Sequence, residues 1–322
     1  MVIIIIGIWL SYGLGCSRSA REEKDSSSGA EASSSASSRK SAERQKTTGQ
    51  KAEAKSAEAK SVEPQVQSEI GKMEADKRAN LLKDAESALE ETRNALTALD
   101  KGDKNAALAA LERASGKLDL VVSRDPKLAF APVDVATSVL DLYATPDTVK
   151  AVIKEAKDDL SNNRVQQARQ LVTDLASEAD TSVIEIPLAT YPAAIKAVAP
   201  LIDAGKTDEA KAALNAALNT LVIETYVVPL PRVRAQAMLR QAEHIAAKSN
   251  RTQDDNQKAR SFIEATRTQL QLAETLGYGT KSDYKPLYAQ LDDIQKKAEN
   301  GQSGRGLFAK VQQSLKNFKF SS

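Results

Sequence analysis

Three carboxylates in apolar stretches are the residues of this sequence best suited to ligand chemistry. Asp134 lies in AFAPVDVATSVLDLY, Glu185 in TSVIEIPL and Glu224 in TLVIETYVVPLP. A buried carboxylate is costly unless it is paired or hydrogen-bonded, so these acids could line a polar pocket together with Tyr226 and Arg232. Their pKa values would then be shifted, and the pocket would suit a cationic or hydrogen-bonding ligand.

The same acids also fit a simpler arrangement without a pocket. Alternation along VIETYVV places Ile223 on one face of an extended segment and Glu224 and Tyr226 on the other. Each acid would then lie on the solvent face of a strand or cap a helix. Both interpretations remain open at the level of the sequence.

Catalytic and metal chemistry is restricted by the scarcity of two residue types. The chain has one Cys, Cys16, and one His, His244. A Cys/His zinc site needs three or four ligands, and a Ser–His or Cys–His nucleophile system would depend on His244 alone. We therefore assign no catalytic residue, no metal site and no cofactor, expect no enzyme, and place His244 on the surface of a helix.

Charge is nearly balanced along the whole sequence. It holds 45 basic and 43 acidic residues, a formal net charge of +2. Nucleic-acid-binding proteins usually present a basic face, so we expect no nucleic-acid partner.

The first sixteen residues, MVIIIIGIWLSYGLGC, end in a small-residue stretch before Cys16. Their apolar run is too short to span a bilayer but has the length of a signal-peptide core. The ending resembles the lipobox of bacterial lipoproteins, which implies lipidation of Cys16. The expected location is the periplasmic face of the outer membrane, or the soluble periplasm if Cys16 is not lipidated.

Residues 17–71 are rich in Ser, Ala, Lys and Glu, and their large aliphatic residues before Ile70 are Val62 and Val66. Such a segment buries too little apolar area to offset the entropy of ordering. We predict a disordered tether over 17–71, followed by the folded body over 72–300.

The body has the apolar periodicity of helical hairpins. LDKGDKNAALAAL from Leu99 aligns without gaps with IDAGKTDEAKAAL from Ile202, and a weaker copy, LSNNRVQQARQLV, begins at Leu160. Gly102, Asn163 and Gly205 occupy the same position in the three copies, where a left-handed residue would end a helix. We predict a mainly all-α fold of antiparallel helical hairpins in one compact domain.

The segments that follow the three copies are richer in β-branched residues. KLDLVVSRDP is expected to finish its helix, whereas TSVIEIPL and TLVIETYVVPLP are bounded by Pro and favour extended chain. A few short strands joined in a small sheet would accommodate them. Residues 301–322 form a basic amphipathic tail, suited either to a membrane surface or partner or to docking on the body.

Two longer strings resemble the YfdX family of exported bacterial proteins. They are RDPKLAFAPVDV, at Arg124 to Val135, and ETYVVPLP, at Glu224 to Pro231. The resemblance implies a mainly helical envelope domain linked with stress responses. It supplies no catalytic residues.

These observations favour a non-enzymatic, stress-associated protein of the cell envelope. It would bind a partner protein or a small ligand through a groove between helical hairpins, and attach to the membrane through lipidated Cys16. The alternative is a scaffolding lipoprotein with protein–protein contacts alone. Homo-oligomerisation is left open.

Overall fold

The computed structural model describes residues 55–299 and 308–318. Its elements are α2 (Ala57–Arg78), α3 (Lys83–Asp100), α4 (Lys104–Arg124), β1 (Phe130–Asp141), α5 (Pro146–Ser161), α6 (Val165–Val172), β2 (Ser177–Pro187), α7 (Tyr191–Lys196), α8 (Ala199–Asp203), α9 (Thr207–Leu218), β3 (Val222–Pro229), α10 (Leu230–Ala246), α11 (Gln253–Thr275), α12 (Lys281–Glu299) and α13 (Ala309–Lys316). The prediction of a mainly helical protein with a small sheet is confirmed.

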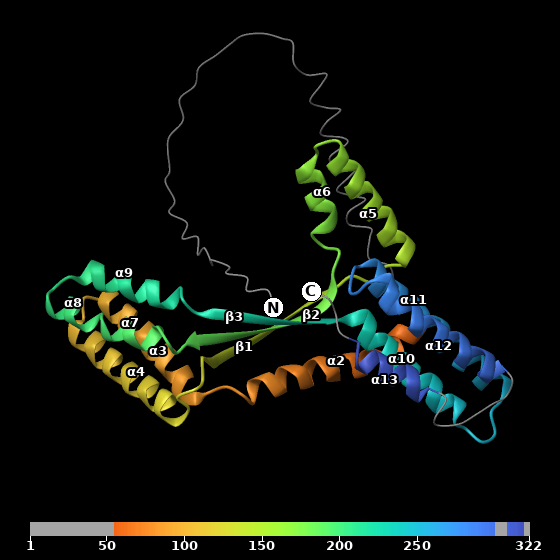
Figure 1. Cartoon of the computed structure of the whole chain (residues 1–322), viewed down its shortest axis with the longest axis horizontal. Helices are drawn as coiled ribbons and strands as arrows, with labels where there is room; N and C mark the ends of the chain where they lie inside the picture. Colours follow the sequence, from red (N-terminus) through yellow and green to blue (C-terminus); the bar gives the residue numbers. More distant parts are fainter. Residues whose placement is uncertain (1–54, 300–307, 319–322) are drawn as a thin grey trace, which may run out of the picture.

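A three-stranded antiparallel sheet joins two groups of helices (Figure 1). The strands are ordered β1-β2-β3, so each pairs with its neighbour in the chain. The chain between β1 and β2 forms the hairpin of α5 and α6, and the chain between β2 and β3 forms α7, α8 and α9. The two helical excursions leave the sheet at opposite ends (Figure 1).

The two predicted strands are present as β2 and β3, and KLDLVVSRDP finishes helix α4 as expected. Strand β1 was not predicted, although it is 12 residues long. Pro132 lies inside this strand, and a Pro within an apolar run argues against a strand in the sequence. The pairing with β2 shifts between Pro132 and Asp134, as in a β-bulge that adds one residue to one strand of the pair.

The three predicted hairpin turns are confirmed. Gly102 and Gly205 both have φ of 74°, and Asn163 has φ of 57°. These are left-handed conformations, which Gly adopts without strain and which Asn tolerates better than most residues. The turns join α3 to α4, α5 to α6, and α8 to α9.

The hairpins α3–α4 and α8–α9 share one hydrophobic core, to which α7 contributes Tyr191 and Ile195. The core is lined largely by Ala and Leu, as the low aromatic content of 4% requires. Small side chains allow helices to approach closely.

Helices α10, α11, α12 and α13 enclose a second core at the other end of the sheet. The C-terminal stripe belongs to it, since Phe308, Val311 and Leu315 are buried against the body. Phe318 packs on Tyr284 with ring centroids 5.0 Å apart. Of the two interpretations of the 301–322 tail, the structure therefore shows docking for residues 308–318.

The predicted boundary of the tether requires a correction. Residues 57–71 are not a loose segment but most of helix α2, in which Val62, Val66 and Ile70 are buried. These residues are spaced four apart, so they form one stripe along the helix. It packs against Ala179 of β2 and against α10 residues such as Leu230 and Met238. The folded body thus includes helix α2.

The remaining predicted N-terminal features lie outside the described residues. They are the signal-like segment 1–16, lipidation of Cys16, and residues 17–54 of the tether. Among the described helices, none combines the length and apolar character needed to cross a bilayer.

Candidate functional site

A groove runs between the start of α5 and one side of α11, and it contains two openings. The first opening has a volume of about 360 Å³. It is lined by Ser56, Glu58, Tyr143, Ala144, Thr145, Met238, Ser261, Glu264, Ala265, Thr268 and Gln269. The second opening also reaches Thr268, so the two adjoin along α11.

Gln269 is the polar group that distinguishes the first opening. Its side chain is 4% exposed, and its Oε1 atom is buried without a hydrogen-bond partner. A buried acceptor of this kind costs roughly 1–3 kcal/mol if it stays unsatisfied. Because Gln269 lines the opening, a ligand with an N–H or O–H donor could satisfy it there.

The surroundings of Gln269 are acidic. Glu58 and Glu264 line the first opening, and none of its described lining residues is basic. Tyr143 adds an aromatic ring. Carboxylates together with an amide acceptor and an aromatic face suit a ligand that carries amine or hydroxyl donors.

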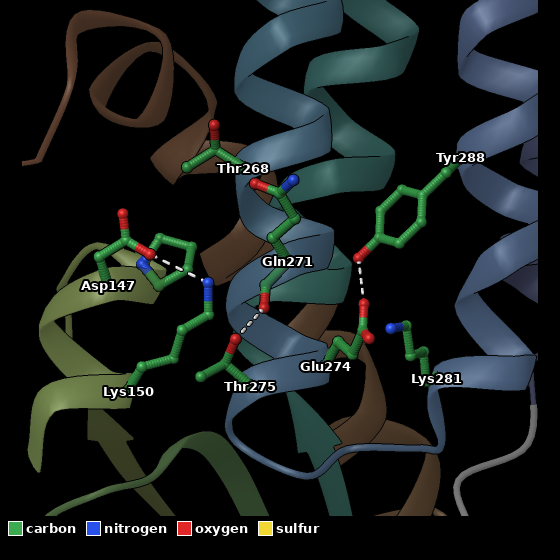
Figure 2. Close-up of a pocket in the computed structure, with 9 residues that line it drawn as sticks. Asp147, Lys150, Thr268, Gln271, Glu274, Thr275, Lys281 and Tyr288 are labelled. Atoms are coloured by element: carbon green, nitrogen blue, oxygen red, sulfur yellow. Dashed lines mark hydrogen bonds and ion pairs between the residues drawn. The ribbon is translucent and has the colours of Figure 1, made fainter. Parts of the chain in front are cut away.

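The second opening is larger, at about 610 Å³, and its charges are balanced (Figure 2). Lys150 donates to Asp147 at 2.9 Å, and the Tyr288 hydroxyl donates to Glu274 at 2.6 Å. Burial, followed by the hydrogen bond to Glu274, raises the pKa of Tyr288. These side chains pair with one another. The second opening therefore lacks a buried polar atom comparable to the unpartnered Oε1 of Gln269 among its described lining residues.

Local sequence explains the walls of the groove. Thr145 caps α5 by accepting from the Thr148 backbone N–H at 3.2 Å, and Pro146 follows at a position where its fixed φ suits the first helical turn. Helix α11 begins with a capping box formed by Thr252 and Asp255. Val149 of α5 and Leu272 of α11 are buried together beneath the groove.

An ion-pair network lies behind Tyr143. The fully buried Arg234 donates to Asp141 at 2.7 Å, Lys55 contacts Asp141 at 2.9 Å, and Lys55 contacts Glu63 at 2.8 Å. The Arg234 Cζ atom lies 5.4 Å from the Tyr143 ring centroid. The network ties the start of α2 to the end of β1 and to α10.

Burial and pairing act in opposite directions on the pKa of these carboxyls. Burial raises the pKa of Asp141, but hydrogen bonds and charges from Arg234 and Lys55 outweigh burial and leave that pKa lowered. Burial likewise raises the pKa of Glu63, and Lys55, Gln67 and Arg234 together lower it. Both groups are therefore held as carboxylates.

Three of the five predicted ligand residues lie together on the sheet, away from the groove. Glu185, Glu224 and Tyr226 share one face, since Glu224 pairs with Val183 and Tyr226 with Thr181 on β2. The Tyr226 hydroxyl donates to Glu224 at 2.6 Å, and Lys77 of α2 lies 3.0 Å from the Tyr226 ring centroid. The hydrogen bond to Glu224 and burial raise the pKa of Tyr226 to about 12.

The other two predicted residues are elsewhere. Asp134 is exposed beside the bulge of β1, where it accepts from the Val135 backbone N–H at 2.8 Å. Arg232 lies on α10, with Nη1 3.5 Å from the Leu315 carbonyl oxygen. The structure thus brings together Glu185, Glu224 and Tyr226 but neither Asp134 nor Arg232.

Burial raises the pKa of Glu185, and the nearby charge of Glu224 adds to that effect while Lys77 opposes it. The solvent-face interpretation fits Glu224, which is exposed, better than Glu185, which is half-buried. Neither Glu185 nor Glu224 lines either opening of the groove.

His244 is exposed on α10, as predicted. Within residues 55–299 and 308–318, no group of three or more His, Cys, Asp or Glu side chains is placed to hold a metal ion.

The sequence did not single out the groove residues. Tyr143 and Gln269 are far apart in the chain. A Gln is also common in a helix that is rich in polar residues, so its residue type alone did not mark Gln269 as unusual. One feature of the sequence could have indicated Gln269, because it is adjacent to Leu270, which belongs to the apolar stripe of α11. A polar residue at a core-facing position is informative.

Residues 88–227 match the family model described as YfdX protein. This match assigns residues 88–227 to the YfdX family. The matched region holds nearly all of the three hairpins and of the sheet, whereas α2 and α10 to α13 lie outside it. The α11 wall of the groove therefore lies outside the matched residues.

Among solved structures, a crystal structure of YfdX from Salmonella Typhi is similar at 15% identity. The match covers 47% of this chain and 93% of that one, with a TM-score of 0.33. No curated protein matches the sequence.

Proposed function

We propose that this YfdX family protein is a non-enzymatic binding protein of the bacterial cell envelope, linked with stress and anchored through Cys16. Its ligand would occupy the groove between the α5–α6 hairpin and α11. The observation that carries this proposal is the buried, unpartnered Oε1 of Gln269 at the first opening.

The chemistry of the opening indicates the class of ligand. Glu58 and Glu264 favour positive charge, Gln269 requires a donor, and Tyr143 offers a ring face to a cation or sugar. A small amine or amino sugar has these properties. In this proposal the ligand is bound and released unchanged.

The test is thermal unfolding of the full chain with spermidine, glucosamine and glucose as probes. A ligand that binds the folded state raises the Tm, and the rise grows with ligand concentration. We expect glucosamine or spermidine to raise the Tm, and glucose, which lacks the amine, to raise it less.

Gln269→Leu separates a binding role from a packing role. Replacing an unsatisfied buried acceptor by an apolar group of similar size is close to neutral or stabilising, so the unliganded variant should unfold at the wild-type Tm or above. The same variant should lose the amine-dependent rise in Tm. The exposed Gln257 of α11, changed to Leu, is the matched control and should keep that rise.

Two results would refute the proposal. One is that no amine raises the Tm of the wild type. The other is that Gln269→Leu lowers the unliganded Tm and keeps any amine-dependent rise, which would make Gln269 a packing residue and favour the scaffolding alternative.

A further inference from the structure

The two openings of the groove form one continuous trough along α11. Thr268 lines both of them, and the lining residues of α11 run from Ser261 in the first opening to Thr275 in the second. Helix α11 rises by about 21 Å between residues 261 and 275. A small amine bound at Gln269 would therefore fill only part of the trough, and the rest is open to a second part of the same ligand.

The two openings differ in charge. Among the described residues, the first opening is lined by the carboxylates of Glu58 and Glu264 and by no basic side chain. The second opening adds two ammonium groups, Lys150 from α5 and Lys281 from the start of α12 (Figure 2). A ligand that lies along the trough would thus meet negative charge at one end and positive charge at the other.

Lys281 is the ammonium that remains for a ligand in the second opening. Lys150 is engaged with Asp147 at 2.9 Å, and the carboxylate of Glu274 accepts from the Tyr288 hydroxyl at 2.6 Å. Among the lining residues drawn in Figure 2, none makes a hydrogen bond or ion pair with Lys281, whose side chain is exposed. An acid group on the ligand would supply the anionic partner of this ammonium.

The spacing along α11 sets the length of the ligand. Gln269, whose buried Oε1 lacks a donor, belongs to the first opening, and Glu274 lines the second together with Lys281. The rise of the helix from residue 269 to residue 274 is about 8 Å. This is the length of a short carbon chain that carries one charged group at each end.

We propose that the ligand of the groove is an elongated zwitterion, with its amine in the acidic first opening and its acid group at Lys281. This inference rests on the proposed function, because it extends the ligand of the same groove. Lys281 is then the residue that selects amines with an acid group over plain amines. Its effect is modest, because ion pairs between exposed groups are weak, and we expect the acid group to strengthen binding about two- to fivefold.

The test is isothermal titration calorimetry of the full chain with ε-aminocaproate, ε-aminocaproamide and hexanoate. The first two probes have the same length and the same amine, and they differ in whether the far end is charged. Low ionic strength is used, because salt screens exposed charges. Wild type should bind ε-aminocaproate about two- to fivefold more tightly than the amide, and should bind hexanoate, which lacks the amine, least.

Lys281→Gln should bind ε-aminocaproate and its amide with equal affinity and should unfold at the wild-type Tm, because the side chain is exposed. The matched control is Lys285→Gln. Lys285 is exposed on the same helix and lines neither opening, so this variant should keep the wild-type preference.

Three results would overturn the inference and leave the proposed function intact. The wild type could bind the acid and the amide equally, the two Lys variants could lose the preference equally, or glucosamine or spermidine could raise the Tm while neither aminocaproyl probe binds. A protein that binds no amine of any kind would overturn the proposed function itself.

Discussion

Arg234 is the largest fully buried side chain among the described residues. Its charge needs acidic partners, and one of them, Glu63, lies on α2. Two of its nitrogens, Nε and Nη1, have no hydrogen-bond partner. The buried charge of Arg234 is therefore balanced mainly by Asp141 at 2.7 Å, while Glu63 lies further away at 3.7 Å. Removing one partner of a buried pair is far more damaging than replacing both.

Asp141→Asn should therefore destabilise the protein at neutral pH by about 3 kcal/mol, since it leaves Arg234 buried with a weakened partner. Urea unfolding of the variant and of the exposed control Asp203→Asn would measure the difference. A loss no larger than that of the control would show that Arg234 is compensated in another way.

The same network predicts how stability depends on pH. The folded-state pKa values of Asp141 and Glu63 are lowered from 3.8 and 4.5. The contribution of these two carboxylates to the free energy of unfolding is therefore complete above the unfolded-state pKa values. It is lost as the pH falls from those values toward the lower folded-state pKa values. Wild type should lose stability below about pH 5 more steeply than Asp141→Asn, as followed by unfolding at a series of pH values.

At the scale of elements, hairpin turns were the most predictable feature. Gly102, Asn163 and Gly205 were recognised because a left-handed residue between two apolar helical stripes has a specific local cause. Strand β1 was missed because Pro132 within it argues against a strand, and α2 was missed because its stripe consists of only a few aliphatics in a polar segment. The groove was missed because its walls meet only in the tertiary structure.

Glycine substitutions test the turns. Gly102→Ala and Gly205→Ala should each cost about 1–2 kcal/mol, because a Cβ is disfavoured at a φ of 74°. Gly116→Ala is the control within α4, where the new Cβ would meet no atom within 4 Å. It should stabilise by up to about 1 kcal/mol through helix propensity. Equal effects of the three changes on thermal unfolding would contradict the assignment.

Helix α2 can be tested by one buried and one exposed position. Val66→Asp places a carboxylate against Ala179 and Leu230 and should destabilise by about 3 kcal/mol or more. Ser68→Asp, on the exposed side of the same helix, should have little effect. Limited proteolysis near residues 57–71 would report release of α2, and resistance of the Val66→Asp variant would contradict its docking.

At the scale of the whole molecule, the proposed attachment to the membrane would depend on Cys16. Trp9 is the single Trp of the chain and precedes Cys16, so cleavage at Cys16 would remove it. The mature protein should show no tryptophan emission, and Cys16→Ser should move it from the membrane to the soluble fraction. Tryptophan emission from purified membrane-bound protein, or unchanged fractionation of the variant, would argue against lipidation.

The ladder between β1 and β2 has a consequence for how this architecture can vary. Asp141 and Ser177 face each other at its end, so the 35 residues between them, 142–176, leave and return at a single point. A two-residue β-turn could close the same pair of strands, and the entropy of closing a loop rises only slowly with its length. The length of the excursion between β1 and β2 can thus change while the register of these two strands stays the same.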